Sequence, residues 1–196
     1  MIGLSTLGGF LHDALIWSCL SSTLISRATA ATPSPPALSF LYTAYVQCAG
    51  NLMETDGPHG IRKAIPIVGG NFTGPRLSGK ILDVGADWGL VDPKTNIFSA
   101  DTRYNLRTDD GENIFVQTSG PTAPQGGLHL RLVFETGSRK YYWLNNIIAI
   151  GILTPISSSE TGSLLRIDAW NMASDWNSTT FVEQVEYGRN SMESSI

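Results

Sequence analysis

The stretch from residue 68 to residue 88 constrains the fold more than any other part of the chain. It contains five glycines and one proline around a strand-like run, and it ends in Gly85-Ala86-Asp87-Trp88. Glycine permits tight bends and the close approach of neighbouring backbones. Strands that kink or curl need both, as they do where a sheet closes on itself. This density of glycine therefore favours a closed β-barrel.

Short apolar or alternating runs, separated by turn residues, follow one another along the body of the chain. They cover residues 38–48, 61–68, 77–84, 97–106, 114–118, 128–135, 143–154 and 164–170. Residues 128–135 show a period of two, since every second side chain from Leu128 to Phe134 is apolar. Strands at such even spacing predict an all-β fold, a closed antiparallel β-barrel of about eight strands. A barrel of this size has room for at most one small ligand.

We divide the chain into three parts by composition. Residues 1–37 form a leader with a Pro-rich linker, residues 38–172 form the barrel domain, and residues 173–196 form a polar tail. The leader has an apolar run at residues 14–25, followed by Ala28-Thr29-Ala30, which resembles a signal peptide with its cleavage site. No Lys or Arg precedes the run, so a disordered leader and a misassigned start codon are the alternatives.

The apolar run of the leader is too short for a stable membrane span. We therefore expect a secreted protein, or one of the secretory-pathway lumen, in preference to a cytoplasmic one. In that compartment the chain would be a glycoprotein, with acceptor sites at Asn71 and Asn177.

Charge and motif content exclude several functions. Thirteen Lys and Arg stand against seventeen Asp and Glu with no basic block, so no nucleic-acid partner is expected. Cys48 is the one thiol of the body, which leaves no zinc ligand set. There is no dinucleotide fingerprint, P-loop or nucleophile elbow, so we expect no cofactor and no metal. Residues 108–111 (TDDG) lack the spacing of a calcium loop and predict a hairpin turn.

Asp87 and His129 are the candidates for proton transfer. A carboxyl pressed against the indole of Trp88 has its pKa raised by desolvation, which makes an acid or base for neutral pH. The alternative is an Asp that caps a turn while Trp88 fills the core. His129 lies in a predicted strand and has the pKa of a proton shuttle, although a lone strand histidine is more often structural.

Two rows of polar side chains alternate along predicted strands. One contains Arg103 within residues 101–107, and the other contains Arg131 and Glu135. Facing inward, they would polarise a carbonyl or bind a carboxylate. Facing outward, they would form a solvated surface with weak ion pairs, and this is the favoured reading because small barrels fill with apolar side chains.

Residues 141–154 combine aromatic, amide and β-branched side chains. The aromatic and amide residues at 141–146 suit an apolar ligand with one or two polar groups, and would equally suit a barrel core. The run 143–154 is nearly all apolar, which predicts a strand buried on both faces. Because something must cover its outer face, we expect a homo-oligomer, either a dimer or a trimer.

Three motifs, residues 69–88 (GGNFTGPRLSGKILDVGADW), 101–111 (DTRYNLRTDDG) and 134–145 (FETGSRKYYWLN), resemble the family called domain of unknown function 3237. The resemblance extends over roughly residues 38–170 and is strongest to the fungal branch. It implies an antiparallel barrel similar in outline to the allene oxide cyclase and dirigent barrels, in which an apolar cup steers cyclisation or coupling without a cofactor. The family has no established general activity, so the resemblance transfers no catalytic residue.

These observations lead to the hypothesis of a cofactor-free, pericyclase-like cyclase or isomerase that acts on a small apolar natural-product intermediate of fungal secondary metabolism. The catalytic candidates are Asp87, Arg103 and His129, and the substrate-binding candidates are Trp88, Tyr104, Arg131, Glu135, Trp143 and Asn145. The alternative is a non-catalytic, lipocalin-like carrier of a small apolar ligand. A third reading is a structural barrel with a filled interior.

Overall fold

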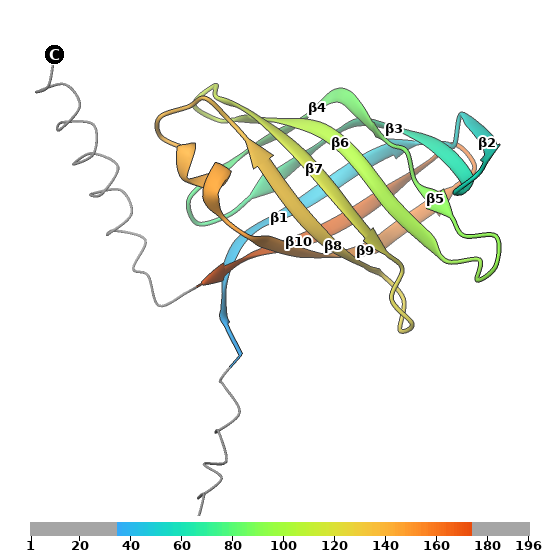
Figure 1. Ribbon diagram of the computed structural model, residues 1–196. Helices are drawn as coiled ribbons and strands as arrows, with labels where there is room; N and C mark the ends of the chain where they lie inside the picture. Colours follow the sequence, from blue (N-terminus) through green and yellow to red (C-terminus); the bar gives the residue numbers. More distant parts are fainter. Residues whose placement is uncertain (1–34, 174–196) are drawn as a thin grey trace, which may run out of the picture. The chain divides into compact units, whose positions relative to one another are not determined.

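Antiparallel strands and one short 3-10 helix account for most of residues 35–173, the part of the chain that the computed structural model describes (Figure 1). The strands are β1 (Ala37–Ala49), β2 (Met53–Gly57), β3 (Gly60–Thr73), β4 (Ser78–Asp87), β5 (Leu90–Val91), β6 (Phe98–Thr108), β7 (Asn113–Pro121), β8 (Leu128–Glu135), β9 (Ala149–Ser159) and β10 (Gly162–Ala173), and the helix is η1 (Tyr142–Asn146). The predicted signal peptide, the polar tail and the Asn177 acceptor lie outside the described residues, whereas Asn71 is exposed on β3.

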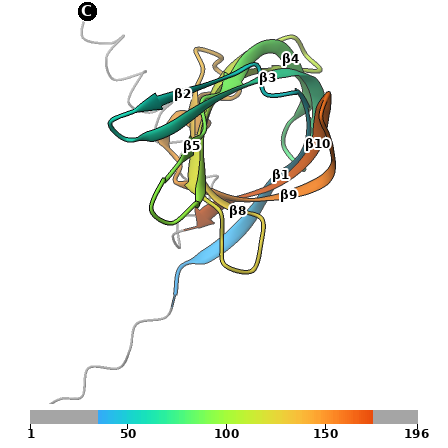
Figure 2. The same ribbon diagram turned by 90° about the vertical axis from the view of Figure 1, so that its right-hand side faces the viewer.

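The sheet closes into a barrel because β1 pairs with β10 on one side and with β3 on the other. The ten-stranded sheet runs in the order β1-β10-β9-β8-β7-β6-β4-β3-β2, and the additional pairing of β1 with β3 leaves β2 and β5 outside a ring of eight strands. Figure 2 looks along this ring from the end where β2 and β5 lie. The predicted all-β, closed antiparallel barrel of about eight strands is confirmed. No helix within residues 35–173 is long and apolar enough to cross a membrane.

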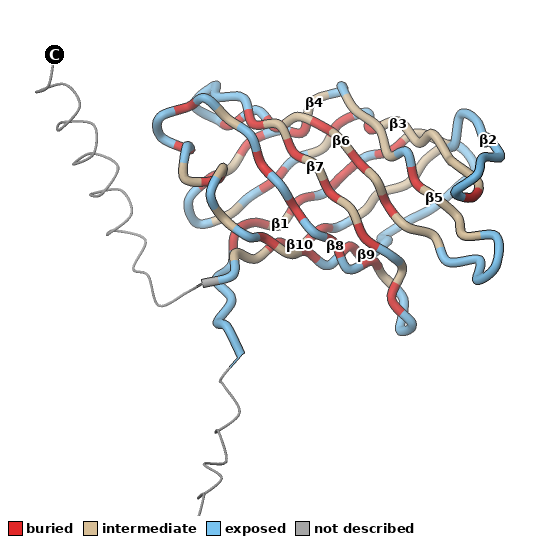
Figure 3. The backbone as a smooth tube through the Cα atoms, in the orientation of Figure 1, coloured by how far each residue is buried: buried red, intermediate tan, exposed pale blue. Residues whose placement is uncertain are grey.

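Alternation along the strands sets which side chains face the interior. In β8 the apolar positions from Leu128 to Phe134 are buried while the residues between them are exposed (Figure 3). In β6 the buried positions are the even-numbered ones from Ala100 to Thr108. Directly paired residues of neighbouring strands share a face of the sheet. The register between strands therefore shows which side chains face the interior in every strand of the ring.

A glycine allows the barrel to close at the seam between β1 and β3. Gly70 pairs with Val46 and has a φ of 137°, a backbone conformation that side chains disfavour. A Cβ at this position would collide with the backbone carbonyl oxygen of Tyr45 in β1. The seam therefore requires a residue without a side chain, which explains one of the glycines in the most constraining stretch of the sequence.

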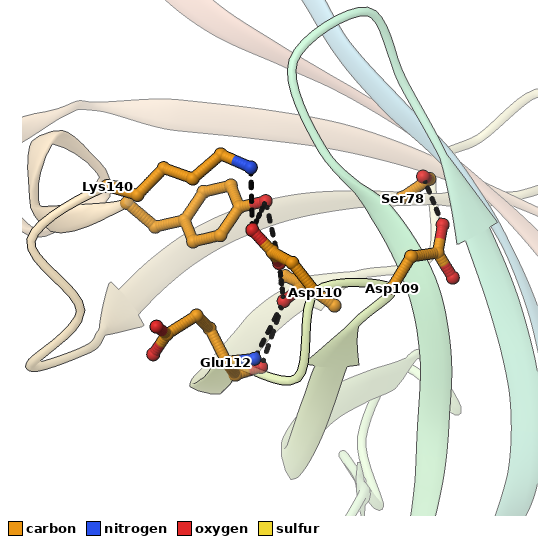
Figure 4. A network of polar contacts seen from close by, with 7 residues as sticks. Ser78, Asp109, Asp110, Glu112 and Lys140 are labelled. Atoms are coloured by element: carbon orange, nitrogen blue, oxygen red, sulfur yellow. Dashed lines mark hydrogen bonds and ion pairs between the residues drawn. The ribbon is translucent and has the colours of Figure 1, made fainter.

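The hairpin between β6 and β7 lies at the end of the barrel opposite β2 and β5 (Figure 1). There it is bonded to the loop that precedes η1 (Figure 4). The Asp110 carboxylate accepts hydrogen bonds from Lys140 Nζ at 2.6 Å and from the Tyr141 hydroxyl at 3.0 Å, and a third from the Thr108 hydroxyl. The bond from Lys140, followed by that from Thr108, lowers the pKa of Asp110 to about 2. Residues 108–111 thus form a turn, as predicted, whose carboxylate anchors the loop that leads into η1.

The predicted strand at residues 143–154 is wrong in its first half. Residues Tyr142–Asn146 form η1, and β9 begins only at Ala149. The Asn145 side chain accepts a hydrogen bond from the Thr136 N–H at 2.8 Å and donates one to the Thr136 carbonyl at 2.9 Å. Leu144 is buried in the core. The two hydrogen bonds to Thr136 and the burial of Leu144 hold this segment as a helical turn against the barrel, which an apolar run alone does not reveal.

Candidate functional site

A row of polar side chains crosses the interior in the half of the barrel near β2 and β5. Asp87 at the end of β4 pairs with Thr102 of β6, and Thr102 pairs with Thr118 of β7. Thr102 and Thr118 are buried and Asp87 is half-buried. Because paired residues share a face, all three side chains lie on the inner surface. The row interrupts the apolar lining that surrounds it.

The environment of Asp87 favours its protonated form. Its Oδ1 accepts a hydrogen bond from the backbone N–H of Asp101 at 2.9 Å. Burial raises the pKa of Asp87, and the negative charge of Asp101 adds to it; together they outweigh the hydrogen bonds from the Asp101 N–H and Thr102 and the charge of Arg62, which lower it. A carboxyl that keeps its proton to a higher pH than an ordinary aspartate can act as a general acid and, once ionised, as a base.

Cys48 faces the same interior from β1 and is not a nucleophile. Burial raises the pKa of its thiol to about 11, partly offset by a hydrogen bond with Ser163, and the Asp87 carboxylate raises it further. The thiol is therefore protonated at neutral pH.

Two buried tyrosines also face the interior of the barrel. Tyr104 follows Thr102 by two residues on the inner face of β6, and Tyr42 comes from the inner face of β1. Both side chains are almost completely buried, with exposures of 1% for Tyr104 and 0% for Tyr42. Burial raises the pKa of each phenol, so both are hydrogen-bond donors over the physiological pH range.

The predicted polar rows lie on the outer surface. The Arg103 guanidinium donates to Asp101 Oδ1 at 2.9 Å, and the side chains of His129, Arg131 and Glu135 are exposed. They occupy the odd-numbered positions of β6 and β8, whose even-numbered neighbours fill the core. The structure thus separates Arg103 and His129 from Asp87 by the thickness of the sheet, and a catalytic role for them stays a prediction.

The remaining predicted binding residues lie at opposite ends of the barrel. Trp88, 41% exposed, does not fill the core, and its carbonyl accepts a hydrogen bond from Arg62 at 2.6 Å. Trp143 lies in η1 at the other end, where the Arg76 guanidinium stacks 3.8 Å from its ring centre. Asn145 holds the backbone of Thr136. Of the predicted set, only Asp87 and Tyr104 face the interior of the barrel.

Sequence reasoning missed Tyr42, Cys48, Thr102 and Thr118 as interior polar residues. The alternation in residues 100–107 does place Thr102 and Tyr104 on one face, so the sequence contained that signal. It contained none for the register that sets Thr102 beside Asp87. Within residues 35–173, no group of three or more His, Cys, Asp or Glu side chains is arranged to hold a metal ion.

Comparison with known proteins shows relatives of two kinds. A protein described only as UPF0311 from Rhodopseudomonas palustris (strain TIE-1) is 32% identical over 109 residues, which cover 47% of this chain and 71% of the relative. A "Hydroalkoxylation enzyme" of Penicillium herquei is 30% identical over 137 residues, which cover 70% of this chain and 86% of the relative.

Solved structures of similar proteins have the same barrel-like fold. A "beta-barrel like protein" from Acinetobacter baumannii AYE matches with a TM-score of 0.61 and 32% identity, covering 73% of this chain and 99% of the other. An enzyme from Penicillium herquei matches with a TM-score of 0.57 and 29% identity, covering 72% of this chain and 98% of the other. The model of the family "Protein of unknown function (DUF3237)" matches residues 36–171. The chain therefore belongs to the DUF3237 family of β-barrel proteins.

Proposed function

We propose that this protein is a cofactor-free cyclase of fungal secondary metabolism that adds a hydroxyl group across a carbon–carbon double bond within one small, mostly apolar natural product. Such a reaction isomerises the substrate into a cyclic ether. The single observation that carries the proposal is Asp87, a carboxyl whose pKa burial raises, on the inner face of an otherwise largely apolar barrel. The name of the Penicillium herquei relative, a hydroalkoxylation enzyme, supports the reaction class.

The proposed step balances without any other reactant. Protonated Asp87 donates its proton to one carbon of the double bond, and the substrate hydroxyl oxygen forms a bond to the other carbon. The hydroxyl then loses its proton to the Asp87 carboxylate, which restores the acid. The apolar walls hold the chain of the substrate folded, and they exclude water that would compete with the hydroxyl.

The test uses an ortho-(2-ethylallyl) naphthol, a simple molecule with a hydroxyl within reach of an alkene, whose cyclisation creates a stereocentre bearing a methyl and an ethyl group. In deuterated water the wild-type protein should convert it to a single enantiomer of the cyclic ether, with one deuterium at the newly formed C–H bond. Chiral chromatography with mass detection measures both features. A product that is racemic and forms at the rate seen in buffer alone would contradict the proposal for this substrate class.

A second candidate is the non-catalytic carrier of a small apolar ligand. The largely apolar lining of the barrel favours it, and the hydrogen bond from the Asp101 N–H gives Asp87 a structural role that needs no catalysis. A carrier would bind the naphthol without turning it over, and its affinity would change only a few-fold when Asp87 is replaced. Binding together with turnover distinguishes the enzyme from the carrier.

We also propose that the outer face of β8 and β9 contacts a second copy of the chain. Val133 in β8, Ile148 just before β9 and Ile152 in β9 are exposed by 55%, 66% and 44%. Large apolar side chains gathered on one face of a soluble protein mark interaction surfaces. Light scattering coupled to size exclusion should show a dimer or trimer for the wild type and a monomer for the double variant Ile148→Glu/Ile152→Glu.

Val84→Glu provides the control for this surface. Val84 is 62% exposed on β4, away from β8 and β9, so the variant adds the same kind of charge without touching the proposed contact. In the same light-scattering measurement, Val84→Glu should have the oligomer mass of the wild type. A wild-type protein that runs as a monomer at all concentrations would show that this face does not self-associate.

A further inference from the structure

The backbone ladder that joins β4 and β5 to β6 is interrupted at residues 88–89. Gly85 of β4 pairs with Tyr104, and Val91 of β5 pairs with Phe98, so both strands follow one register along β6. The strand nevertheless ends after β4 and begins again as β5. Because the register does not shift between them, the interruption must have a local cause.

One backbone hydrogen bond of the ladder is replaced at this point. Two residues that face each other in a hydrogen-bonded antiparallel pair exchange both N–H···O bonds. The Trp88 N–H donates to the Asp101 carbonyl at 3.0 Å, as such a pair requires. The Asp101 N–H, however, donates to Asp87 Oδ1 at 2.9 Å. The Asp87 side chain has therefore taken the donor that would otherwise bond the Trp88 carbonyl.

Arg62 of β3 bonds the carbonyl that Asp87 has displaced. Its Nη1 donates to the Trp88 carbonyl at 2.6 Å and lies 3.3 Å from Asp101 Oδ2. Without Arg62, the Trp88 carbonyl would be the regular partner of the Asp101 N–H across the ladder. Arg62 thus occupies the group that competes with Asp87 for this donor.

Arg62 acts from the outer face of the barrel wall. Ile65 of β3 pairs with Asp87 and shares its inner face, and Arg62, three residues earlier in the strand, lies on the opposite face. The Asp101 carboxylate is also bonded by Arg103 Nη1 at 2.9 Å. Loss of the Arg62 side chain would leave that second ion pair in place, so its specific effect is on the Trp88 carbonyl.

The bond from Asp101 decides which oxygen of Asp87 is free. In a protonated carboxyl the carbonyl oxygen is the better acceptor, so Oδ1 keeps the Asp101 N–H and the proton is on Oδ2. Rotation of the carboxyl would break this bond. The acid is therefore held in a single orientation, which proton transfer to a particular carbon requires.

We propose that Arg62 is a positioning residue for Asp87. By bonding the Trp88 carbonyl, it leaves the Asp101 N–H free for the acid and so fixes the orientation of the carboxyl. The kinetic consequences of this inference rest on the proposed function. The exchange of backbone bonds does not, and it can be measured without turnover.

The Asp101 amide proton reports the exchange in an NMR titration. A hydrogen bond to an ionised carboxylate is stronger than one to the neutral acid, so this proton should move downfield as Asp87 ionises. Its midpoint should match that of the Asp87 carboxyl carbon. In Arg62→Met, where the Trp88 carbonyl accepts the N–H again, the step should disappear, as it should in Asp87→Asn.

Kinetics separate positioning from substrate binding. Arg62→Met should lower the kcat for cyclisation of the naphthol by about 10- to 100-fold, the effect of a misplaced catalytic group. KM should stay within a few-fold, because Arg62 lies outside the interior. Arg62→Lys keeps a donor for the carbonyl and should recover most of the rate.

The pH profile supplies a second readout. The charged groups that influence the pKa of Asp87 are Asp101, which raises it, and Arg62, which lowers it, while the Cys48 thiol and the two buried phenols stay neutral. Arg62→Met removes the charge and the hydrogen bond from the Asp101 N–H, which both lower this pKa. The fall of kcat toward alkaline pH should therefore move to higher pH.

Arg166→Met is the matched control. Arg166 is 45% exposed, against 39% for Arg62, and pairs with Asp168 at 3.0 Å. Its variant should keep the kcat and the titration of the Asp101 amide.

The outcomes separate this inference from the proposed function. A wild-type Asp101 amide that does not follow Asp87, or an Arg62→Met variant that keeps either this titration or the wild-type kcat, would overturn the positioning role. An Arg62→Met variant that loses the titration, in a protein whose wild type never cyclises the naphthol, would retain the exchange of bonds and contradict the cyclase.

Discussion

Asp87→Asn should lower the kcat for cyclisation by about 10²- to 10⁴-fold, the range that a general acid contributes. Asparagine has nearly the same shape, and its oxygen can still accept the hydrogen bond that the Asp101 N–H donates to Asp87. The amide cannot transfer a proton to carbon. The affinity for the naphthol should therefore remain within a few-fold of wild type, which fluorescence titration checks beside the kinetics.

The pH dependence follows from the direction of the Asp87 pKa. Because burial raises this pKa, the acid form required for catalysis is lost as the pH rises through it, so kcat should fall toward alkaline pH. Asp83→Asn is the control: Asp83 is exposed on the same strand, and its variant should show the wild-type profile. A profile that stays flat, or an Asp87→Asn variant with wild-type kcat, would mean that Asp87 is a strand cap only.

Asp87→Asn should also be more stable than the wild-type protein at neutral pH. The folded state holds the Asp87 proton more tightly than the unfolded state does, since its folded pKa is raised. The free energy of unfolding therefore decreases as the pH rises from the ordinary range of an aspartate, about 4, through the raised pKa. The amide of the Asp87→Asn variant does not titrate, so the loss should be absent when thermal melts of both proteins are compared across this window.

Gly70→Ala should destabilise the protein by about 3 kcal/mol or more, which corresponds to a melting temperature lower by roughly 6–12 °C for a chain of this size. The methyl group would collide with the Tyr45 carbonyl of the neighbouring strand, and alanine would also be strained at a φ of 137°. Because this position lies at the β1–β3 seam, the barrel cannot relieve the collision without loosening its own closure. Thermal and urea melts measure the effect.

Two further glycines separate the collision from the strain of the backbone. At Gly111, with a φ of 90°, a Cβ would meet nothing within 4 Å, so alanine there should cost about 1–2 kcal/mol from strain alone. At Gly137 neither effect operates, and alanine should change the unfolding free energy by less than about 0.5 kcal/mol. A Gly70→Ala variant as stable as Gly137→Ala would show that the seam adjusts freely.

The sequence could predict the barrel because the relevant signals are local. A period of two, turn residues at even spacing and glycines at kinks act over a few neighbouring residues, and all are present in residues 68–135. The strand predicted at residues 143–154 failed for the opposite reason. There the conformation depends on the bonds between Asn145 and Thr136 and on the burial of Leu144 against the barrel end.

The candidate site, too, could be predicted from the sequence only in part. Asp87 was identified from its immediate neighbours, and the alternation of residues 100–107 grouped Tyr104 with Thr102 and opposed both to Arg103. Whether that group lines the interior or the surface depends on how the ring closes. The burial of Tyr42 and Tyr104 in one core depends on it too, because the two residues come from strands that are separated in the ring by β3 and β4.

The sequence by itself determined the strands, the turns and the alternation of faces, since each arises from interactions along a short piece of chain. Only the tertiary structure decided which face is inside and which polar groups lie there together. Those properties depend on register between strands, and register is fixed by the closure of the whole barrel rather than by any one segment.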